Sequence, residues 1–278
     1  MAPVNQTKNS MDWQLGTMGF AFKDWEGVFY PLTTPNQKYL RIYSGKFNSV
    51  EIDSTFYGTP RQSTILRWRE MTPDNFTISL KMPRRITHDL RLINTDNEVQ
   101  DFVLASSLLE DKLGALLVQF PPSFSADNYD VLQSFLGKLP LGLRFAIEFR
   151  HQSWYTASRD TLTPRVADSL QTRGVCWTAI DYPGVPNTIF PTADFLYIRW
   201  IGQHGRYLEF KREVEDLTPR LESWRQQIFK HQTHIKKIFG YFNNDYAGFA
   251  PKTCNRFMEL VGLPIKQLQP PRQGVLFE

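Results

Sequence analysis

The 278-residue sequence contains only two cysteines, Cys176 and Cys254, and this scarcity excludes several classes of protein. Two thiols make neither the disulfide framework of a small secreted domain nor a thiolate zinc site, so we expect a reducing compartment. No apolar run approaches the roughly 20 residues that a helix needs to cross a bilayer. The first twelve residues are polar and lack the apolar core of a signal peptide. These absences predict a cytoplasmic protein with no membrane partner.

The sequence also lacks a strong excess of either charge. Its 32 basic and 28 acidic residues give a net charge of +4, which permits a polyanion partner without requiring one. A chain of this length buries roughly 75% of its unfolded surface, so it folds without a metal or a disulfide. No repeat, low-complexity tract or Gly/Ser linker divides the sequence. We therefore expect one domain over residues 1–278, with a flexible N-terminus at 1–12 and an extended C-terminal strap at 267–278.

Short apolar runs alternate along the chain with longer amphipathic segments, the pattern of parallel β/α units. The runs that we predict as strands are 13–17, 49–55, 76–81, 115–120, 144–149, 175–181, 195–200 and 236–242. The segments that we predict as helices are 36–46, 63–71, 97–112, 128–139, 160–173, 213–230 and 248–261.

Eight strands that alternate with helices predict a single TIM-type (β/α)8 barrel, because eight strands close around a packed interior. Residues 115–120 are nearly all apolar, as expected for a strand that is covered on both faces. The crossover 181–195 has no helical period, so one crossover helix is short or missing. Gly114 and Gly174 each follow a predicted helix, where we expect a left-handed cap residue.

Polar side chains stand at nearly every predicted strand end, where such barrels place their chemistry. Glu51 and Glu148 lie inside apolar stretches, and a carboxylate there needs a cation beside it; Lys81, Arg150 and Arg199 are the candidate partners. Strand alternation further predicts that Asp53 and Thr55 share the face of Glu51. Two hypotheses stay open: a buried ion-pair network that only holds the strands together, and a polar mouth that binds and transforms a ligand.

Seven motifs in chain order resemble the YecE-like family, catalogued as domain of unknown function 72. They are GTMGF (16–20), VEIDSTFY (50–57), KMPRRITH (81–88), QFPPSF (119–124), EFRHQSW (148–154), YIRW (197–200) and YFNND (241–245). The resemblance implies a TIM-type barrel, a bacterial cytoplasmic protein and no established activity. The signature polar residues of the family fall on Glu51, Lys81, His88, Gln119, Glu148, Arg150, Arg199 and Asn243. Met18, Asp53 and Gly58 depart from the Ser, Asn and Arg that are usual there.

We favour a barrel enzyme, a hydrolase or a lyase, that acts on an anionic small molecule carrying a phosphate or carboxylate group. Glu51 and Glu148 would act as acid and base, and Lys81 would stabilise developing negative charge. Arginine forks match such anions, so Arg84, Arg150 and Arg199 are expected to hold the ligand with Lys81. The full set of predicted ligand-binding residues is Thr17, Asp53, Tyr57, His88, Gln119, Arg150, Trp154, Arg199 and Asn243.

Two functions of other classes stay open beside this enzyme. One is a nucleic-acid-binding or phosphodiester-cleaving barrel, in which rings such as Trp25, Tyr30 and Trp154 stack on bases. The other is a non-catalytic barrel that binds a ligand or a protein. The five histidines lack zinc-helix spacing and no motif specifies a cofactor. A hard-metal site is a further alternative, and its candidate ligands are Glu51, Glu148, Asp181 and His88.

Overall fold

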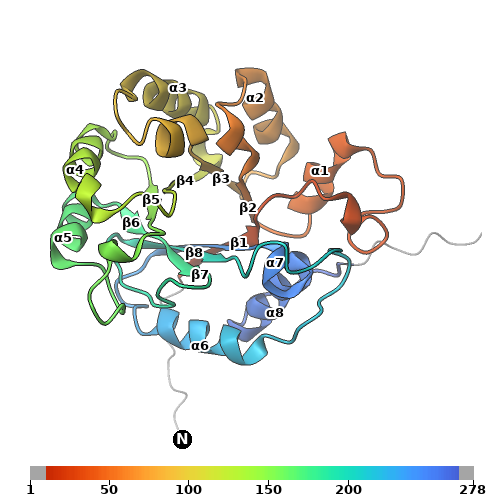
Figure 1. Cartoon of the computed structure of the whole chain (residues 1–278). Coiled ribbons are helices and arrows are strands. Elements are labelled where there is room, and N and C mark those ends of the chain that lie inside the picture. The colour runs from red at the N-terminus through yellow and green to blue at the C-terminus, as the bar shows by residue number, and fades with distance from the viewer. Residues whose placement is uncertain (1–10, 269–278) are drawn as a thin grey trace, which may run out of the picture.

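The computed structural model describes residues 11–268 as an α/β fold in which helices surround parallel strands (Figure 1). The strands are β1 (Asp12–Thr17), β2 (Ser49–Ile52), β3 (Thr77–Lys81), β4 (Leu113–Gln119), β5 (Phe145–Glu148), β6 (Cys176–Trp177), β7 (Ala179–Asp181), β8 (Phe195–Trp200) and β9 (Lys237–Phe242). The helices are α1 (Tyr39–Ser44), α2 (Gln62–Met71), α3 (Asp96–Ser107), α4 (Tyr129–Lys138), α5 (Pro164–Arg173), α6 (Thr218–Phe229), α7 (Asn244–Ala247) and α8 (Ala250–Leu260). Each predicted strand and helix has an observed counterpart, and the strand predicted at 175–181 is divided into β6 and β7.

Hydrogen bonds join the strands into two parallel sheets, ordered β1-β9-β8-β7 and β2-β3-β4-β5-β6. Between β1 and β2 there is a single bridge, from Met18 to Glu51, beside which the Gly19 N–H donates to the Glu51 carbonyl at 2.7 Å. At the other junction Thr178 separates β6 from β7. The predicted α/β fold of parallel strands is thus confirmed. The ladders do not close into one continuous sheet, because pairing is interrupted at these two places.

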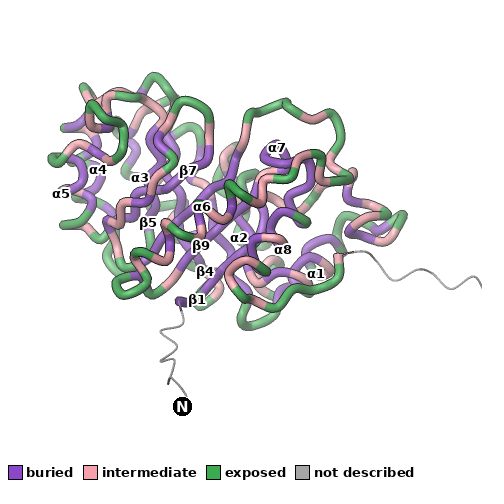
Figure 2. The backbone as a smooth tube through the Cα atoms, turned by 90° about the horizontal axis from the view of Figure 1, so that it is seen from below, coloured by how far each residue is buried: buried purple, intermediate pink, exposed green. Residues whose placement is uncertain are grey.

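Two apolar layers cover the two faces of the strands. The larger one packs the helices against the strands, and Figure 2 shows the strands buried while the outer faces of the helices are exposed. The smaller one draws buried side chains from both sheets, namely Met18, Ala115, Leu117, Ala146, Cys176, Ile180, Phe195, Tyr197, Ile201, Phe239 and Tyr241. Since alternate residues of a strand point to opposite faces, strands covered on both sides read as nearly continuous apolar runs.

The two predicted glycine caps have different outcomes. Gly174 ends α5 in the left-handed conformation, with φ 61°, as predicted. The prediction for Gly114 is wrong, because this residue lies inside β4 rather than after a helix. A Cβ atom there would stand 2.5 Å from Ser79 Oγ, so the glycine is required for close packing between strands.

Further local predictions concern the crossover after β7 and the end of the second strand. No helix occupies the crossover between β7 and β8, as predicted. The second strand ends at Ile52 rather than at residue 55, so the prediction that Asp53 and Thr55 share a strand face with Glu51 is wrong. Residues 53–57 instead turn through a 3-10 helix, Ser54–Tyr57, which ends the alternation of faces.

The predicted terminal segments lie mostly outside the described residues. Of the N-terminus predicted at 1–12, the structure describes Met11, which is buried, and Asp12, which opens β1. Of the strap predicted at 267–278, it describes Gln267 and Leu268, whose carbonyls accept hydrogen bonds from Lys46 Nζ at 2.8 Å. Within residues 11–268, no helix is both long enough and apolar enough to cross a bilayer.

Candidate functional site

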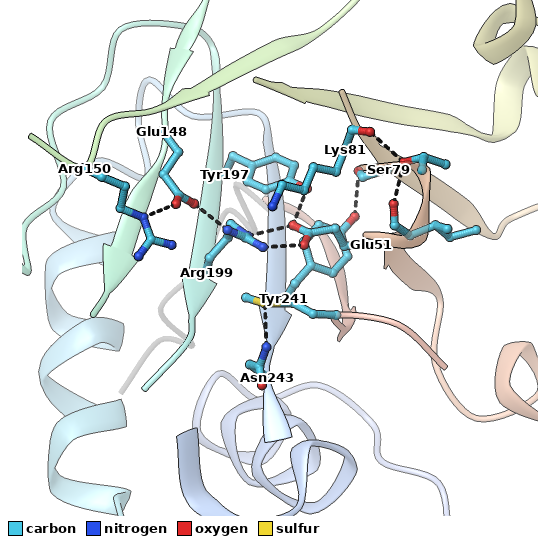
Figure 3. A network of polar contacts seen from close by, with 12 residues as sticks. Glu51, Ser79, Lys81, Glu148, Arg150, Tyr197, Arg199, Tyr241 and Asn243 are labelled. Carbon is cyan, nitrogen blue, oxygen red and sulfur yellow. Dashed lines mark hydrogen bonds and ion pairs between the residues drawn. The ribbon is translucent and has the colours of Figure 1, made fainter. Parts of the chain in front are cut away.

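The Arg199 guanidinium joins two buried carboxylates at the carboxyl ends of the strands (Figure 3). Its Nε and Nη2 donate to the two oxygens of Glu51, at 2.9 and 2.8 Å, and its Nη1 donates to Glu148 Oε2 at 2.6 Å. Arg199 is itself only 5% exposed, and the two carboxylates raise the pKa of its guanidinium despite burial. β2, β5 and β8 therefore bring three of the predicted residues together in one hydrogen-bonded cluster.

Glu51 is fully buried at the end of β2, and its carboxylate is saturated with donors. Besides the bidentate pair with Arg199, its Oε2 accepts a hydrogen bond from the Tyr197 hydroxyl at 2.7 Å. Burying an ion this deeply is tolerated only when a cation and further donors surround it. The geometry therefore holds Glu51 as a fixed carboxylate.

Glu148 is fully buried at the end of β5, between two guanidinium groups. Arg150 Nε donates to its Oε1 and Arg199 Nη1 to its Oε2. Burial raises the pKa of this carboxyl, but the two arginines outweigh burial and lower it to about 2. Glu148 is consequently ionised throughout the neutral range, with both oxygens occupied.

Lys81, the last residue of β3, is a cation near this cluster that makes no ion pair of its own. Among residues 11–268, no carboxylate oxygen lies within 4 Å of its Nζ and no hydrogen bond forms from it. The ammonium lies over the Phe56 ring, 4.0 Å from the centroid, and Figure 3 shows the side chain extending toward Arg199. Burial and the nearby Arg199 lower the pKa of Lys81 to about 8, against opposing effects of Glu148, Glu51 and Asp53.

His88 lies on the segment after β3, in a single π-helical turn, Arg85–Asp89. Its Nδ1 shares a 2.8 Å hydrogen bond with the Thr87 hydroxyl, and its ring meets the Phe56 ring edge-on at 4.9 Å. Partial burial and the charge of Lys81 lower the pKa of His88 to about 4, so the imidazole is neutral near pH 7. Phe56 thus contacts both Lys81 and His88.

Three other predicted ligand-binding residues are buried and engaged in local contacts. The Thr17 hydroxyl donates to the Gly19 carbonyl at 2.6 Å, and Gln119 Nε2 donates to the Phe120 carbonyl. Trp154 has no exposed surface, donates from Nε1 to the Phe124 carbonyl at 2.6 Å and stacks on Phe149. The structure places all three beside the strand ends as parts of the packing.

The remaining predicted residues reach solvent to different degrees. Asp53 and Tyr57 are exposed, Tyr57 to 87% of its surface. Asn243 is half-buried after β9, where its side chain accepts a hydrogen bond from the Asp245 N–H and its Nδ2 lies 3.6 Å from Met18 Sδ. Arg84, predicted to hold an anion, is exposed and paired with Asp89 at 3.1 Å.

Neither the hard-metal alternative nor base stacking gains support from these positions. Within residues 11–268, no three His, Cys, Asp or Glu side chains are grouped so that they could hold a metal ion. Asp181 is separated from the cluster by its own partners, accepting from Arg220, Trp224 Nε1 at 2.8 Å and the Tyr246 hydroxyl at 2.8 Å. Trp25 and Tyr30, which were predicted as rings that could stack on bases, have no exposed surface.

The sequence-based prediction missed two buried tyrosines whose hydroxyls form hydrogen bonds near the strand ends. Tyr197 binds Glu51, and the Tyr241 hydroxyl shares hydrogen bonds of 2.7 and 2.8 Å with the hydroxyls of Ser49 and Ser79. Tyr197 stands two residues before Arg199, and Tyr241 two residues before Asn243. Because residues two apart share a strand face, counting back from the polar strand ends would have identified both of these residues.

Comparison with known proteins gives a family but no activity. The model of a family described as "Protein of unknown function DUF72" matches residues 14–274. UPF0759 protein YecE of Escherichia coli strain K12 is 32% identical over 142 residues, which cover 51% of this chain and 52% of YecE, so the chain spans about half the length of that relative. UPF0759 protein YunF of Bacillus subtilis is 26% identical and is matched over 89% of this chain and 95% of its own length.

Solved structures agree with the fold. A DUF72 family protein of Thermotoga maritima superposes with a TM-score of 0.75 at 26% identity, covering 90% of this chain and 99% of its own. A DUF72 family protein of Enterococcus faecalis gives a TM-score of 0.74 at 20% identity, over 92% of this chain and 100% of its own, and shows the fold alone. The resemblance found in the seven motifs is thereby confirmed, and this chain belongs to the DUF72 family.

Proposed function

We propose that the carboxyl ends of the strands form the site of an enzyme that acts on a small anionic molecule. The observation that carries this proposal is an excess of positive charge: within residues 11–268, Lys81, Arg150 and Arg199 meet only two buried carboxylates. A purely structural ion-pair network needs no such excess, because an unpaired cation near a desolvated cluster is unfavourable. A bound anion would balance it.

The donors that would hold this anion are Arg150 and Lys81. Arg150 uses only its Nε on Glu148, and in the described part of the chain its two terminal nitrogens form no hydrogen bond. Its side chain is 12% exposed and its guanidinium lies over the Tyr182 ring at 4.0 Å. A guanidinium fixed on one side presents its remaining N–H groups as a fork that suits carboxylate or phosphate oxygens.

We propose that the two sheets together form the frame of this site, as the two parts of one barrel. Both sheets contribute side chains to the smaller apolar layer, and the Met18–Glu51 bridge and Thr178 stand where the sheets adjoin. In a (β/α)8 barrel, residues from the ends of different strands meet at one mouth, which is where catalytic groups are found. We infer that arrangement for this chain, as one barrel domain.

Within this function, the roles first given to Glu51 and Glu148 change. Both carboxylates accept hydrogen bonds from guanidinium groups at each oxygen, and the pKa of Glu148 is lowered to about 2. They therefore suit the positioning of Arg199 and Arg150 better than proton transfer. Lys81, whose pKa is lowered to about 8, is the better proton-transfer group because its pKa lies near neutral pH.

A phosphorus NMR titration with inorganic phosphate tests the anion site. We expect wild-type protein to bind phosphate and Lys81→Met to bind it about 10- to 100-fold more weakly, because a hydrogen bond to a charged group is worth about 1.5–3 kcal/mol. Lys138→Met, at an exposed lysine paired with Asp96, is the control and should bind like the wild type. Equal phosphate affinity in all three proteins would contradict the proposal.

A further inference from the structure

Lys81 is a polar residue at the strand ends that forms no ion pair within residues 11–268. The carboxylates of Glu51 and Glu148 are both committed to arginines, so the nearby lysine takes no part in their pairing. Its side chain extends toward Arg199, another cation, and its terminal nitrogen lies over the face of the Phe56 ring (Figure 3). A lysine placed merely for stability would be expected to lie against a carboxylate.

We propose that Lys81 is a nucleophile that forms an imine with the carbonyl carbon of a small carbonyl compound bearing an anionic group, such as a 2-oxo acid. This inference rests on the anion site proposed above, because Arg150 would hold the carboxylate or phosphate of the same molecule. A lysine next to another cationic group is one of the known arrangements that activates an amine for this chemistry.

Burial and Arg199 favour the neutral Lys81 amine that the reaction requires, whereas the Phe56 ring beside Nζ favours the charged form. Burial disfavours the ammonium most, and Arg199 from β8 also repels it. The pKa of Lys81 is raised by three carboxylates, namely Glu148 on β5, Glu51 on β2 and Asp53 in the turn that follows β2. His88 is neutral near pH 7 and adds no charge. With a pKa of about 8, about one tenth of the lysine is neutral at pH 7, roughly 300 times more than for an ordinary lysine.

The step is balanced without any other reactant. The Nζ lone pair attacks the carbonyl carbon, the carbonyl π electrons move to oxygen, and a proton passes from nitrogen to oxygen to give a carbinolamine. Loss of the hydroxyl with the second amine proton as water leaves the imine. When protonated, that imine withdraws electrons from the neighbouring carbon–carbon or carbon–hydrogen bond, which makes a lyase the better fit of the two enzyme classes expected.

Reductive trapping tests the proposal. Full-length protein is incubated with sodium cyanoborohydride and, separately, pyruvate, 2-oxobutyrate or dihydroxyacetone phosphate, and the modified lysines are identified by peptide mass. We expect one probe or more to label Lys81 at least tenfold faster than the exposed Lys138 and Lys236, with phosphate slowing the reaction. Lys81→Arg, which keeps the charge, should lose this label, whereas Lys138→Arg should keep it.

The outcomes separate the two proposals. If no probe labels Lys81 preferentially while phosphate still binds in the NMR titration, the imine is excluded and the anion site stands. If neither labelling nor phosphate binding occurs, both proposals fail. Labelling of Lys81 that phosphate does not slow would support the amine nucleophile and contradict the anion site beside it.

Discussion

The Arg199 guanidinium holds two buried carboxylates, and the free energy of this cluster depends on which charge is removed. Taking one partner from a buried pair leaves the other uncompensated, which costs more than the pair contributes when intact. Arg150 and Arg199 both donate to Glu148, so removing this carboxylate takes a shared partner from two guanidinium groups. The carboxylate is thus structurally necessary even where the chemistry is assigned to Lys81.

Replacing Glu148 by glutamine should destabilise the protein by about 3–5 kcal/mol at pH 7, because two guanidinium groups lose their shared charge. The folded-state pKa of Glu148 is lowered from 4.5 to about 2, so its contribution is complete above pH 4.5 and is lost as the pH falls toward 2. The difference in urea-unfolding free energy between wild type and Glu148→Gln should shrink across that range. Glu110→Gln, at an exposed pair with Arg69, serves as the control and should cost under about 1 kcal/mol. Equal stability of wild type and Glu148→Gln at pH 7 would refute the structural role.

The charge of Lys81 should destabilise the folded protein, whereas the charge of Glu148 stabilises it. The pKa of Lys81 is lowered from 10.5 to about 8 on folding. Between these two pH values the unfolded chain binds more protons than the folded one, so stability rises with pH. Below about pH 8 the charged lysine destabilises the folded protein by its full amount. Lys81→Met should therefore be more stable than wild type by about 1–2 kcal/mol at pH 7, allowing for partial exposure of the side chain. The gain should diminish toward pH 10 in the same unfolding measurement. A less stable variant at pH 7 would mean that the lysine is a structural cation.

Among the elements, β1 and β2 approach each other more closely than their single bridge suggests. A Cβ atom on Gly16 would stand 1.9 Å from the Ser49 carbonyl oxygen and 2.6 Å from the Tyr43 hydroxyl. The absence of a side chain at Gly16 therefore lets the two sheets meet where Met18 bridges Glu51. The position of Glu51, and through it that of Arg199, depends on this contact.

Gly16→Ala should destabilise the protein by about 3 kcal/mol, because the new methyl group meets backbone that moves only if the strands separate. Gly137 in α4 is a matched control: a Cβ there meets nothing within 4 Å. Gly137→Ala should stabilise by about 0.5–1 kcal/mol, since alanine favours a helix interior over glycine. Urea-unfolding curves of both variants provide the comparison. A neutral Gly16→Ala would show that β1 and β2 have room between them.

Elements were predictable where a periodic apolar pattern was long, and less so at their ends. The strand signals located β1 to β9 because parallel strands buried on both faces are nearly continuous apolar runs. The break at Thr178 and the turn after Ile52 come from tertiary contacts that no local pattern encodes. For the site, the positions of Glu51, Glu148 and Lys81 followed from strand ends. Which arginine reaches which carboxylate did not, because that depends on side chains from strands far apart in sequence.

For the whole molecule, the smaller apolar layer implies that the two sheets unfold together. Cys176 lies in that layer, whereas Cys254 lies on α8 against the larger one, and both thiols are free and fully buried. If the layers are interdependent, both thiols should become reactive toward a thiol reagent at the same urea concentration. That concentration should match the midpoint of the circular dichroism transition. Exposure of Cys254 at clearly lower urea than Cys176 would indicate that the layers separate independently.

In the proposed site, the strand ends bind an anion through the donors that the ion pairs leave free. A crystal structure of the protein soaked with phosphate tests it most directly. We expect tetrahedral density bonded to the terminal nitrogens of Arg150 and to Lys81 Nζ, with the Arg199 contacts to Glu51 and Glu148 unchanged. Phosphate found only on the outer helices, with Lys81 and Arg150 unoccupied, would contradict it.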